Sequence, residues 1–195
     1  MRVIAGKFRS RRLRSPGRLG IRPTSDRLRE TLFDILSGGD PQALVGSLWI
    51  DLFAGTGAVG IEALSRGAAM VYFVESAKGP ADLIRENLEA LGIQSGFALL
   101  RDEGQRSLRA IDEQGFRPNY IFLDPPYEFH YLYGEILDAL SSYALGECAL
   151  VIAEHEKRFD PGEKLGSFRR LRKLDQGDAV LGFYRRPPLL EPSSG

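Results

Sequence analysis

The segment Asp124-Pro125-Pro126-Tyr127 follows directly on a strand-like apolar run, Tyr120–Leu123. Two consecutive prolines fix φ at both positions and donate no backbone hydrogen bond, so the strand must end there. What remains is a rigid turn that carries a carboxylate, carbonyl oxygens and an aromatic ring. These groups suit an exocyclic amine on a ring, because the Asp124 carboxylate and the Pro125 carbonyl can both accept its N–H groups.

Such an amine is a poor nucleophile, since its lone pair is delocalised into the ring. Hydrogen bonds to Asp124 and Pro125 would hold the nitrogen in line for attack and favour its tetrahedral form as positive charge develops. The ring of Tyr127 can stack on a base, a contact worth about 1–3 kcal/mol. A base would have to leave its stack to reach this turn.

A second candidate site is the glycine loop of Asp51-Leu52-Phe53-Ala54-Gly55-Thr56-Gly57-Ala58-Val59-Gly60. It contains G-x-G-x-x-G between a predicted strand and a predicted helix, and Glu75 ends the next strand 20 residues after Gly55. Glycines let the backbone approach a ligand closely, and a carboxylate at the end of the second strand can hold ribose hydroxyls. The pattern fits a nicotinamide dinucleotide, S-adenosylmethionine, or a turn that serves packing alone.

Asp51 favours S-adenosylmethionine. It stands at the carboxyl end of the first predicted strand, where its charge would repel the pyrophosphate of a dinucleotide. It would attract the sulfonium and ammonium groups of S-adenosylmethionine. Asp102, after the third predicted strand, could cap the following helix. The glycine loop resembles that of the class I methyltransferases, in which an acid at this place often binds the adenine amino group, and the two roles are compatible.

The elements that must position these residues alternate along the chain. Short apolar strands are predicted at Leu48–Phe53, Met70–Glu75, Phe97–Arg101, Tyr120–Asp124 and Ala149–Glu154, with helices near Val59–Ser65, Gly79–Leu91, Gln105–Glu113 and Tyr131–Ser142 between them. This alternation predicts an α/β fold, a doubly wound, mostly parallel, Rossmann-like sheet. The runs Ser167–Leu174 and Ala179–Tyr184 lack an intervening helix and predict a closing antiparallel hairpin, which makes seven strands.

The chain divides by composition into a basic arm (1–23), the α/β domain (24–186) and a tail (187–195). Basic residues dominate the arm, although the net charge of the whole chain is zero. The arm suggests contact with a polyanion, or else a solvated extension. Within it, Val3–Phe8 and Arg11–Arg14 could form a small hairpin. A helix capped by Thr24 or Ser25 follows and ends at Gly38.

Several functional classes find little support. The one cysteine, Cys148, lies in the strand-like run Cys148–Ala153 and is expected to be buried and inert. The two histidines, His130 and His155, have no metal-ligand spacing. His130 is close enough to Tyr127 to line the same pocket. No apolar run approaches the roughly 20 residues of a membrane span, and the opening residues lack the apolar stretch of a signal peptide. We therefore expect no bound metal and a cytoplasmic location.

The motifs resemble those of known enzymes. The D-x-F-x-G-x-G pattern is similar to motif I of the class I methyltransferases, and Asp-Pro-Pro-Tyr is similar to motif IV of the amino-methyltransferases. The segments Arg2–Leu13 and Arg22–Phe33 then resemble the opening of the RsmD family, which methylates guanine N2 in 16S ribosomal RNA. The resemblance covers the chain to about Tyr184, with Phe8 where many relatives have Trp.

The resemblance implies three groups of site residues. Binding of S-adenosylmethionine would fall to Asp51, Phe53, Gly55, Gly57, Glu75 and Asp102, the target amine to Asp124, Pro125, Pro126 and Tyr127, and RNA phosphates to Arg9, Arg11, Arg12, Arg22 and Arg27. Arg29 and Glu30 are instead expected to be an exposed pair on the first helix. The implied partner is 16S ribosomal RNA within the 30S subunit or an assembly intermediate, bound by a monomer.

Other functions remain open on the sequence. The same chemistry could serve adenine N6 in DNA, another RNA, or a protein glutamine, because phosphate contacts read no sequence. A non-enzymatic RNA-binding assembly factor and an NAD-dependent oxidoreductase are further alternatives.

Overall fold

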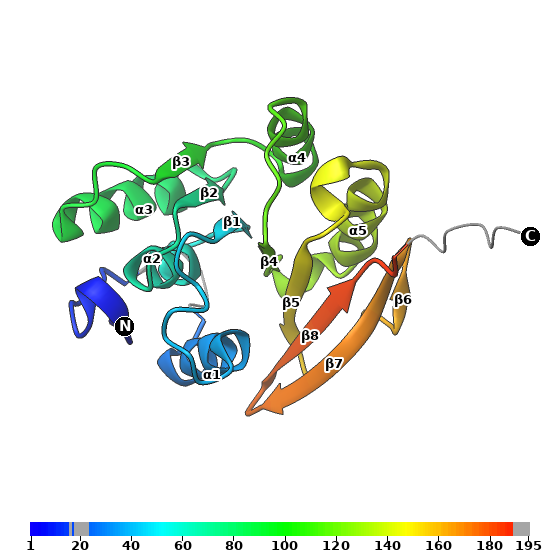
Figure 1. Ribbon diagram of the computed structural model, residues 1–195, viewed down its shortest axis with the longest axis horizontal. Coiled ribbons are helices and arrows are strands. Elements are labelled where there is room, and N and C mark those ends of the chain that lie inside the picture. Colours follow the sequence, from blue (N-terminus) through cyan, green and yellow to red (C-terminus); the bar gives the residue numbers. More distant parts are fainter. Residues whose placement is uncertain (16, 18–23, 189–195) are drawn as a thin grey trace, which may run out of the picture.

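The computed structural model describes residues 1–15, 17 and 24–188, which form a single eight-stranded sheet with helices on both sides (Figure 1). Its strands are β1 (Leu48–Leu52), β2 (Met70–Val74), β3 (Phe97–Leu100), β4 (Tyr120–Leu123), β5 (Leu150–Glu156), β6 (Lys164–Leu165), β7 (Phe168–Gln176) and β8 (Ala179–Arg185). Its α-helices are α1 (Asp26–Ser37), α2 (Ala58–Ser65), α3 (Lys78–Leu91), α4 (Gly104–Glu113) and α5 (Tyr131–Ser142).

The strands lie in the order β3-β2-β1-β4-β5-β8-β7-β6, and the first five are parallel. The first strand along the chain, β1, lies inside the sheet; the chain then runs outward through β2 and β3 and returns to β4 on the other side of β1. The order of the strands therefore reverses between β1 and β4. In doubly wound sheets, ligands bind at such a reversal, beyond the carboxyl ends of the strands.

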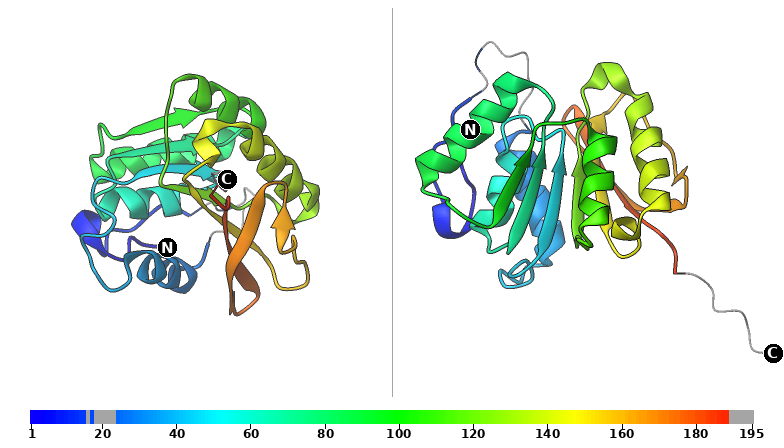
Figure 2. Two further views of the ribbon diagram at one scale, coloured as in Figure 1. Left: turned by 45° about the vertical axis from the view of Figure 1, so that its right-hand side comes forward. Right: turned by 90° about the horizontal axis from the view of Figure 1, so that it is seen from above.

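Helices cover both faces of the sheet (Figure 2), and an apolar core lies on each side of it. Alternate side chains of a strand point to opposite faces, so Trp49 packs with α1, α2 and α3, whereas Ile50 and Leu52 pack with α4 and α5. Because both faces are covered, the central strands read as continuous apolar runs in the sequence. This packing fixes the positions of the loops that follow β1 and β4.

The antiparallel end of the sheet contains one strand more than the sequence indicated. The hairpin of β7 and β8 is confirmed, and β8 pairs with β5. The additional strand, β6, has only two residues and pairs with the start of β7. A two-residue strand carries no alternating pattern, which is why seven strands were predicted instead of eight.

The two ends of the basic arm pair as in the predicted hairpin, but the segment between them does not form the expected strand. Arg2 and Arg12 form an antiparallel bridge, whereas Gly6–Phe8 is a short 3-10 helix, so the expected strand over Val3–Phe8 is wrong. Glu62 of α2 accepts the backbone N–H groups of Ile4 (2.7 Å) and Ala5 (2.9 Å), which a partner strand would otherwise bind. Gly6 has φ +78°, and a Cβ there would lie 1.8 Å from a backbone oxygen of α2.

Two further expectations are wrong: Arg29 is not exposed, although its neighbour Glu30 is, and Cys148 is not buried. Arg29 is fully buried, and its guanidinium donates to the carbonyl of Arg2 (2.7 Å) and the carboxylate of Asp26 (2.6 Å), so it ties the arm to α1. Cys148 is exposed, because it lies in the loop before β5. Among the described residues, no helix is long and apolar enough to cross a membrane.

Candidate functional site

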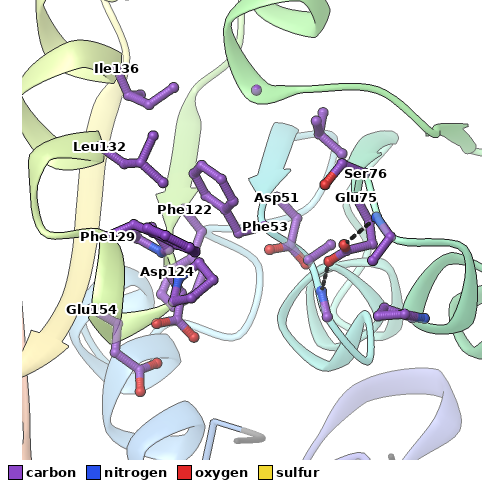
Figure 3. A pocket seen from close by; sticks show the side chains of 18 of the residues that line it. Asp51, Phe53, Glu75, Ser76, Phe122, Asp124, Phe129, Leu132, Ile136 and Glu154 are labelled. Atoms are coloured by element: carbon purple, nitrogen blue, oxygen red, sulfur yellow. Dashed lines mark hydrogen bonds between the residues drawn. The ribbon is translucent and has the colours of Figure 1, made fainter. Parts of the chain in front are cut away.

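A pocket of about 880 Å³ opens at the carboxyl ends of β1, β2, β4 and β5 (Figure 3). Its walls include the glycine loop, the end of β2, the loop before α4 and the double-proline turn. It thereby brings together most of the predicted site residues: Asp51, Phe53, Gly55, Glu75, Asp102, Asp124, Pro125, Pro126 and Tyr127. Gly57 is the exception, since it shapes the loop without lining the pocket. The two motifs, about seventy residues apart in sequence, share one cavity.

Glu75 holds the glycine loop in place with its carboxylate. One oxygen accepts the backbone N–H of Gly55 (3.0 Å), and the other accepts the backbone N–H of Ala77 at the start of α3 (2.9 Å; dashed in Figure 3). A carboxylate can accept about four hydrogen bonds. Glu75 therefore keeps acceptor capacity for two hydroxyl groups, and its binding of a ribose stays a prediction.

Asp51 lies beneath the loop and is only 2% exposed. Its carboxylate accepts the backbone N–H of Gly60 at 2.9 Å. Burial raises the pKa of Asp51 to about 8; the Gly60 hydrogen bond opposes this rise, and the charges of Glu75 and Glu154 add to it. A cationic ligand in the pocket would favour the ionised form of Asp51.

The charges of the lining separate the two cofactor classes that the glycine loop left open. The acidic side chains that line the pocket are Asp51, Glu75, Asp102, Glu103, Asp124, Glu128, Glu135 and Glu154. Among the described residues, no Lys, Arg or His belongs to this lining. A pyrophosphate would be repelled there, whereas the sulfonium and ammonium groups of S-adenosylmethionine would be attracted. The pocket therefore fits S-adenosylmethionine and disfavours a dinucleotide.

The backbone of the glycine loop is bent sharply. Phe53 has φ +58°, an uncommon value for a residue with a side chain and one that costs of order 1–3 kcal/mol. In the view of Figure 3, the Phe53 ring lies between the half of the pocket near Glu75 and the half near Asp124. Gly57 has φ +73° and begins α2, so it serves the turn that the glycine pattern predicts.

Asp102 lines the pocket and is about half exposed. Its carboxylate accepts the backbone N–H of Glu103 (2.8 Å), and Arg106 lies 3.7 Å from it. The residue that caps α4 is Glu103, with no side-chain hydrogen bond. The helix-capping role considered for Asp102 is therefore wrong, and its position in the pocket leaves adenine binding as a prediction.

The double-proline turn is held against the central strand. The Asp124 N–H reaches the Leu52 carbonyl of β1 at 3.5 Å, and the Phe129 N–H donates to the Pro126 carbonyl at 2.8 Å. The second bond closes a short 3-10 helix, Tyr127–Phe129, directly before α5. Phe129, Leu132 and Ile136 supply an apolar wall beside the turn (Figure 3).

Two polar residues of the pocket, Glu154 and Thr24, were not predicted as site residues from the sequence. Glu154 is 4% exposed, lines the pocket near Asp124, and accepts a hydrogen bond from the Thr24 hydroxyl at 3.0 Å. Ser25 caps α1, which leaves Thr24 for this contact. The available signal for Glu154 was an acidic residue at the end of the predicted apolar strand Ala149–Glu154, which in the structure continues to Glu156.

The remaining predicted residues lie outside the pocket. Of the arginines assigned to RNA, Arg9, Arg11, Arg12 and Arg27 are exposed, and Arg22 falls outside the described residues. Arg11 donates to the carbonyl of Ala90 in α3 (3.0 Å). His130 does not line the pocket: its Nε2 lies 2.9 Å from a carboxylate oxygen of Glu156, and its ring stacks on Phe159.

Known proteins resemble the chain over most of its length. The family model described as Conserved hypothetical protein 95 matches residues 1–185. Ribosomal RNA small subunit methyltransferase D of Escherichia coli (strain K12) is 36% identical over 157 residues, which are 80% of this chain and 75% of that protein. YlbH of Bacillus subtilis (strain 168), named as a candidate rRNA methyltransferase, is 33% identical over 189 residues, 95% of this chain and 99% of that protein. The solved structure of yhhF from Escherichia coli, a candidate methyltransferase, has a TM-score of 0.77 and 27% identity and covers 95% of this chain and 97% of that chain.

Proposed function

The chain belongs to the Conserved hypothetical protein 95 family, the RsmD family of methyltransferases, and we propose that it methylates the exocyclic N2 amine of a guanine in 16S ribosomal RNA with S-adenosylmethionine as donor. The observation that carries this proposal is the shared pocket. It places the Gly55 loop and Glu75 in one cavity with Asp124 and Tyr127. A methyl donor and a target amine can therefore meet without any rearrangement of the sheet.

The residues around the glycine loop would hold the donor. Glu75 would accept the ribose hydroxyls, Asp51 would face the cationic part of the molecule, and Asp102 would bind the adenine end. When bound, S-adenosylmethionine supplies an electrophilic methyl group. The apolar rings and chains beside the pocket keep water away from the reacting atoms, which strengthens every electrostatic contact there.

The double-proline turn would hold the target. The Asp124 carboxylate and the Pro125 carbonyl accept the two N–H groups of the amine, and the Tyr127 ring stacks on the base. These contacts orient the nitrogen lone pair towards the donor half of the pocket, and they strengthen as positive charge develops on the nitrogen. Asp124 is also placed to take up the proton that the nitrogen loses after the transfer.

The exposed arginines of the arm and of α1 would bind RNA phosphates outside the pocket. Arg9, Arg11 and Arg12 lie in the arm that packs along α2 and α3, and Arg27 lies on the first turn of α1. The substrate we propose is 16S ribosomal RNA in the 30S subunit or an assembly intermediate. The protein would act in the cytoplasm. It would act as a monomer, because one chain supplies both halves of the pocket.

Transfer of a labelled methyl group tests the proposal. The purified protein is incubated with labelled S-adenosylmethionine and, in separate reactions, 30S subunits, protein-free 16S ribosomal RNA and DNA. The 30S subunits must come from cells that lack the gene, so that the target amine is unmodified. We expect label in the ribosomal RNA as N2-methylguanosine. Label confined to DNA, or label in RNA as N6-methyladenosine, would contradict the proposal.

A further inference from the structure

Glu154 stands beside Asp124 in the half of the pocket that takes the target. The parallel strands β4 and β5 pair with Leu123 opposite Ala153, so the next residues lie at the same level: Asp124 directly follows β4, and Glu154 lies within β5. Both line the pocket, and Figure 3 shows their two carboxylates directed to the same part of it. The target base therefore meets two adjacent carboxylates and not one.

The position of Glu154 is tightly fixed. The Thr24 hydroxyl donates to its Oε2 at 3.0 Å, and the Tyr133 hydroxyl donates to its backbone carbonyl at 2.6 Å. The residue as a whole is 4% exposed. Burying a carboxylate is costly unless hydrogen-bond donors satisfy it. The residue also lines the pocket, so its carboxylate can meet a hydrogen-bond donor that enters there.

Two adjacent carboxylates select among the bases that carry an exocyclic amine. On the Watson–Crick edge of guanine, the N2 amine lies next to N1–H, so both neighbouring groups are donors. Adenine and cytosine place a ring nitrogen that only accepts beside their amine. A carboxylate opposite such a nitrogen would face lone pair against lone pair, which disfavours those bases.

We propose that Glu154 is a specificity-determining residue that accepts the N1–H of the target guanine while Asp124 accepts the N2 amine. This inference rests on the proposed function and adds the means by which the site distinguishes guanine from the other amino bases. The Thr24 hydroxyl sets the orientation of the Glu154 carboxylate. The junction between the arm and α1 is thereby connected to base selection.

The test compares two bases that share the N2 amine. 2-Aminopurine keeps that amine but has an unprotonated N1, so it cannot donate to Glu154. 16S ribosomal RNA is assembled by ligation with either guanine or 2-aminopurine at the position that the wild-type protein methylates. The ratio of kcat/KM for the two RNAs is measured for the wild type, for Glu154→Gln and for a matched control, Glu156→Gln, on the same strand but outside the pocket lining.

We expect the wild type to favour guanine. In Glu154→Gln, the amide can donate to the unprotonated N1 of 2-aminopurine and still accept from Thr24, so the guanine preference should fall roughly 10- to 100-fold. Glu156→Gln should keep the wild-type preference. The absence of O6 from 2-aminopurine affects all three proteins alike, so the change in preference isolates the contact at N1.

The outcomes separate this inference from the proposed function. If the kcat/KM values of the wild type for the two RNAs lie within threefold of each other, the proposed contact with N1–H is overturned, whether or not Glu154→Gln folds. An unchanged preference in a Glu154→Gln protein that binds S-adenosylhomocysteine like the wild type overturns it as well. A wild type that transfers no methyl group to any RNA overturns the proposed function itself, and the inference with it.

Discussion

The buried carboxylate of Asp51 gives the stability of this protein a distinctive pH dependence. Its pKa is raised from an ordinary value of 3.8 to about 8 in the folded protein. Between these two values the folded state binds a proton that the unfolded state has released, so the free energy of unfolding must fall as the pH rises. Asp51→Asn keeps the size of the side chain and an oxygen acceptor for Gly60, but it cannot titrate.

The size of the effect follows from that difference. Each unit of pKa change corresponds to about 1.4 kcal/mol, and from pH 5 to pH 8 the wild type should lose about 3.5 kcal/mol relative to Asp51→Asn. Urea unfolding of both proteins at several pH values measures this loss. Trp49 is the one tryptophan of the chain and is fully buried, so its fluorescence reports the transition.

Comparison of the two proteins cancels the titrating groups that do not interact with Asp51. The difference in their free energies of unfolding should therefore change with pH through Asp51 and its coupling to the charges of Glu75 and Glu154. Parallel pH profiles for wild type and Asp51→Asn would refute the conclusion that this carboxylate is held in a desolvated position beneath the glycine loop.

Three further predictions concern other parts of the structure. Glu75→Ala removes the acceptor for the backbone N–H groups of Gly55 and Ala77 and for the ribose. We expect calorimetry to show that S-adenosylhomocysteine binds roughly 10- to 100-fold more weakly to this variant. An unchanged Kd would exclude Glu75 from the donor site. Replacing Arg9 and Arg12 by Ala should weaken RNA binding while the methylated base stays the same. The slope of the logarithm of the binding constant against the logarithm of the salt concentration should fall in magnitude by about one for each phosphate that is no longer bound. A changed base would show that these arginines read sequence. Arg29→Ala removes the buried donor to the Arg2 carbonyl and to Asp26 and opens a cavity. Urea unfolding should therefore show a loss of about 2–4 kcal/mol in the free energy of unfolding. A loss below about 0.5 kcal/mol, the range of an ordinary surface substitution, would contradict the anchoring role of Arg29.

The central α/β pattern could be predicted from the sequence because local signals and tertiary packing agree there. The strand that contains Asp51 and the strands that directly precede Glu75 and Asp124 are short apolar runs, each followed by a loop and then a helix. Their carboxyl ends must meet at one edge of a parallel sheet. This is why two motifs far apart in sequence could be placed in one cavity before the structure was known.

The features that escaped prediction depend on contacts between distant residues. Arg29 has the sequence context of an exposed helix residue, and only the arm that folds over α1 buries it. The strand expected in the arm is replaced by a 3-10 helix because Glu62 of α2 binds its backbone N–H groups. Glu154 becomes part of the site only through the pairing of β4 with β5.

The methylated nucleosides of 16S ribosomal RNA provide the most direct test of whether the two halves of the pocket work together. Mass spectrometry compares RNA from cells with the gene, from cells without it, and from cells complemented with the wild type or Asp124→Ala. We expect one N2-methylguanosine to be lost without the gene, restored by the wild type and not restored by Asp124→Ala. An unchanged N2-methylguanosine content in cells without the gene, or full restoration by Asp124→Ala, would contradict methyl transfer across this pocket.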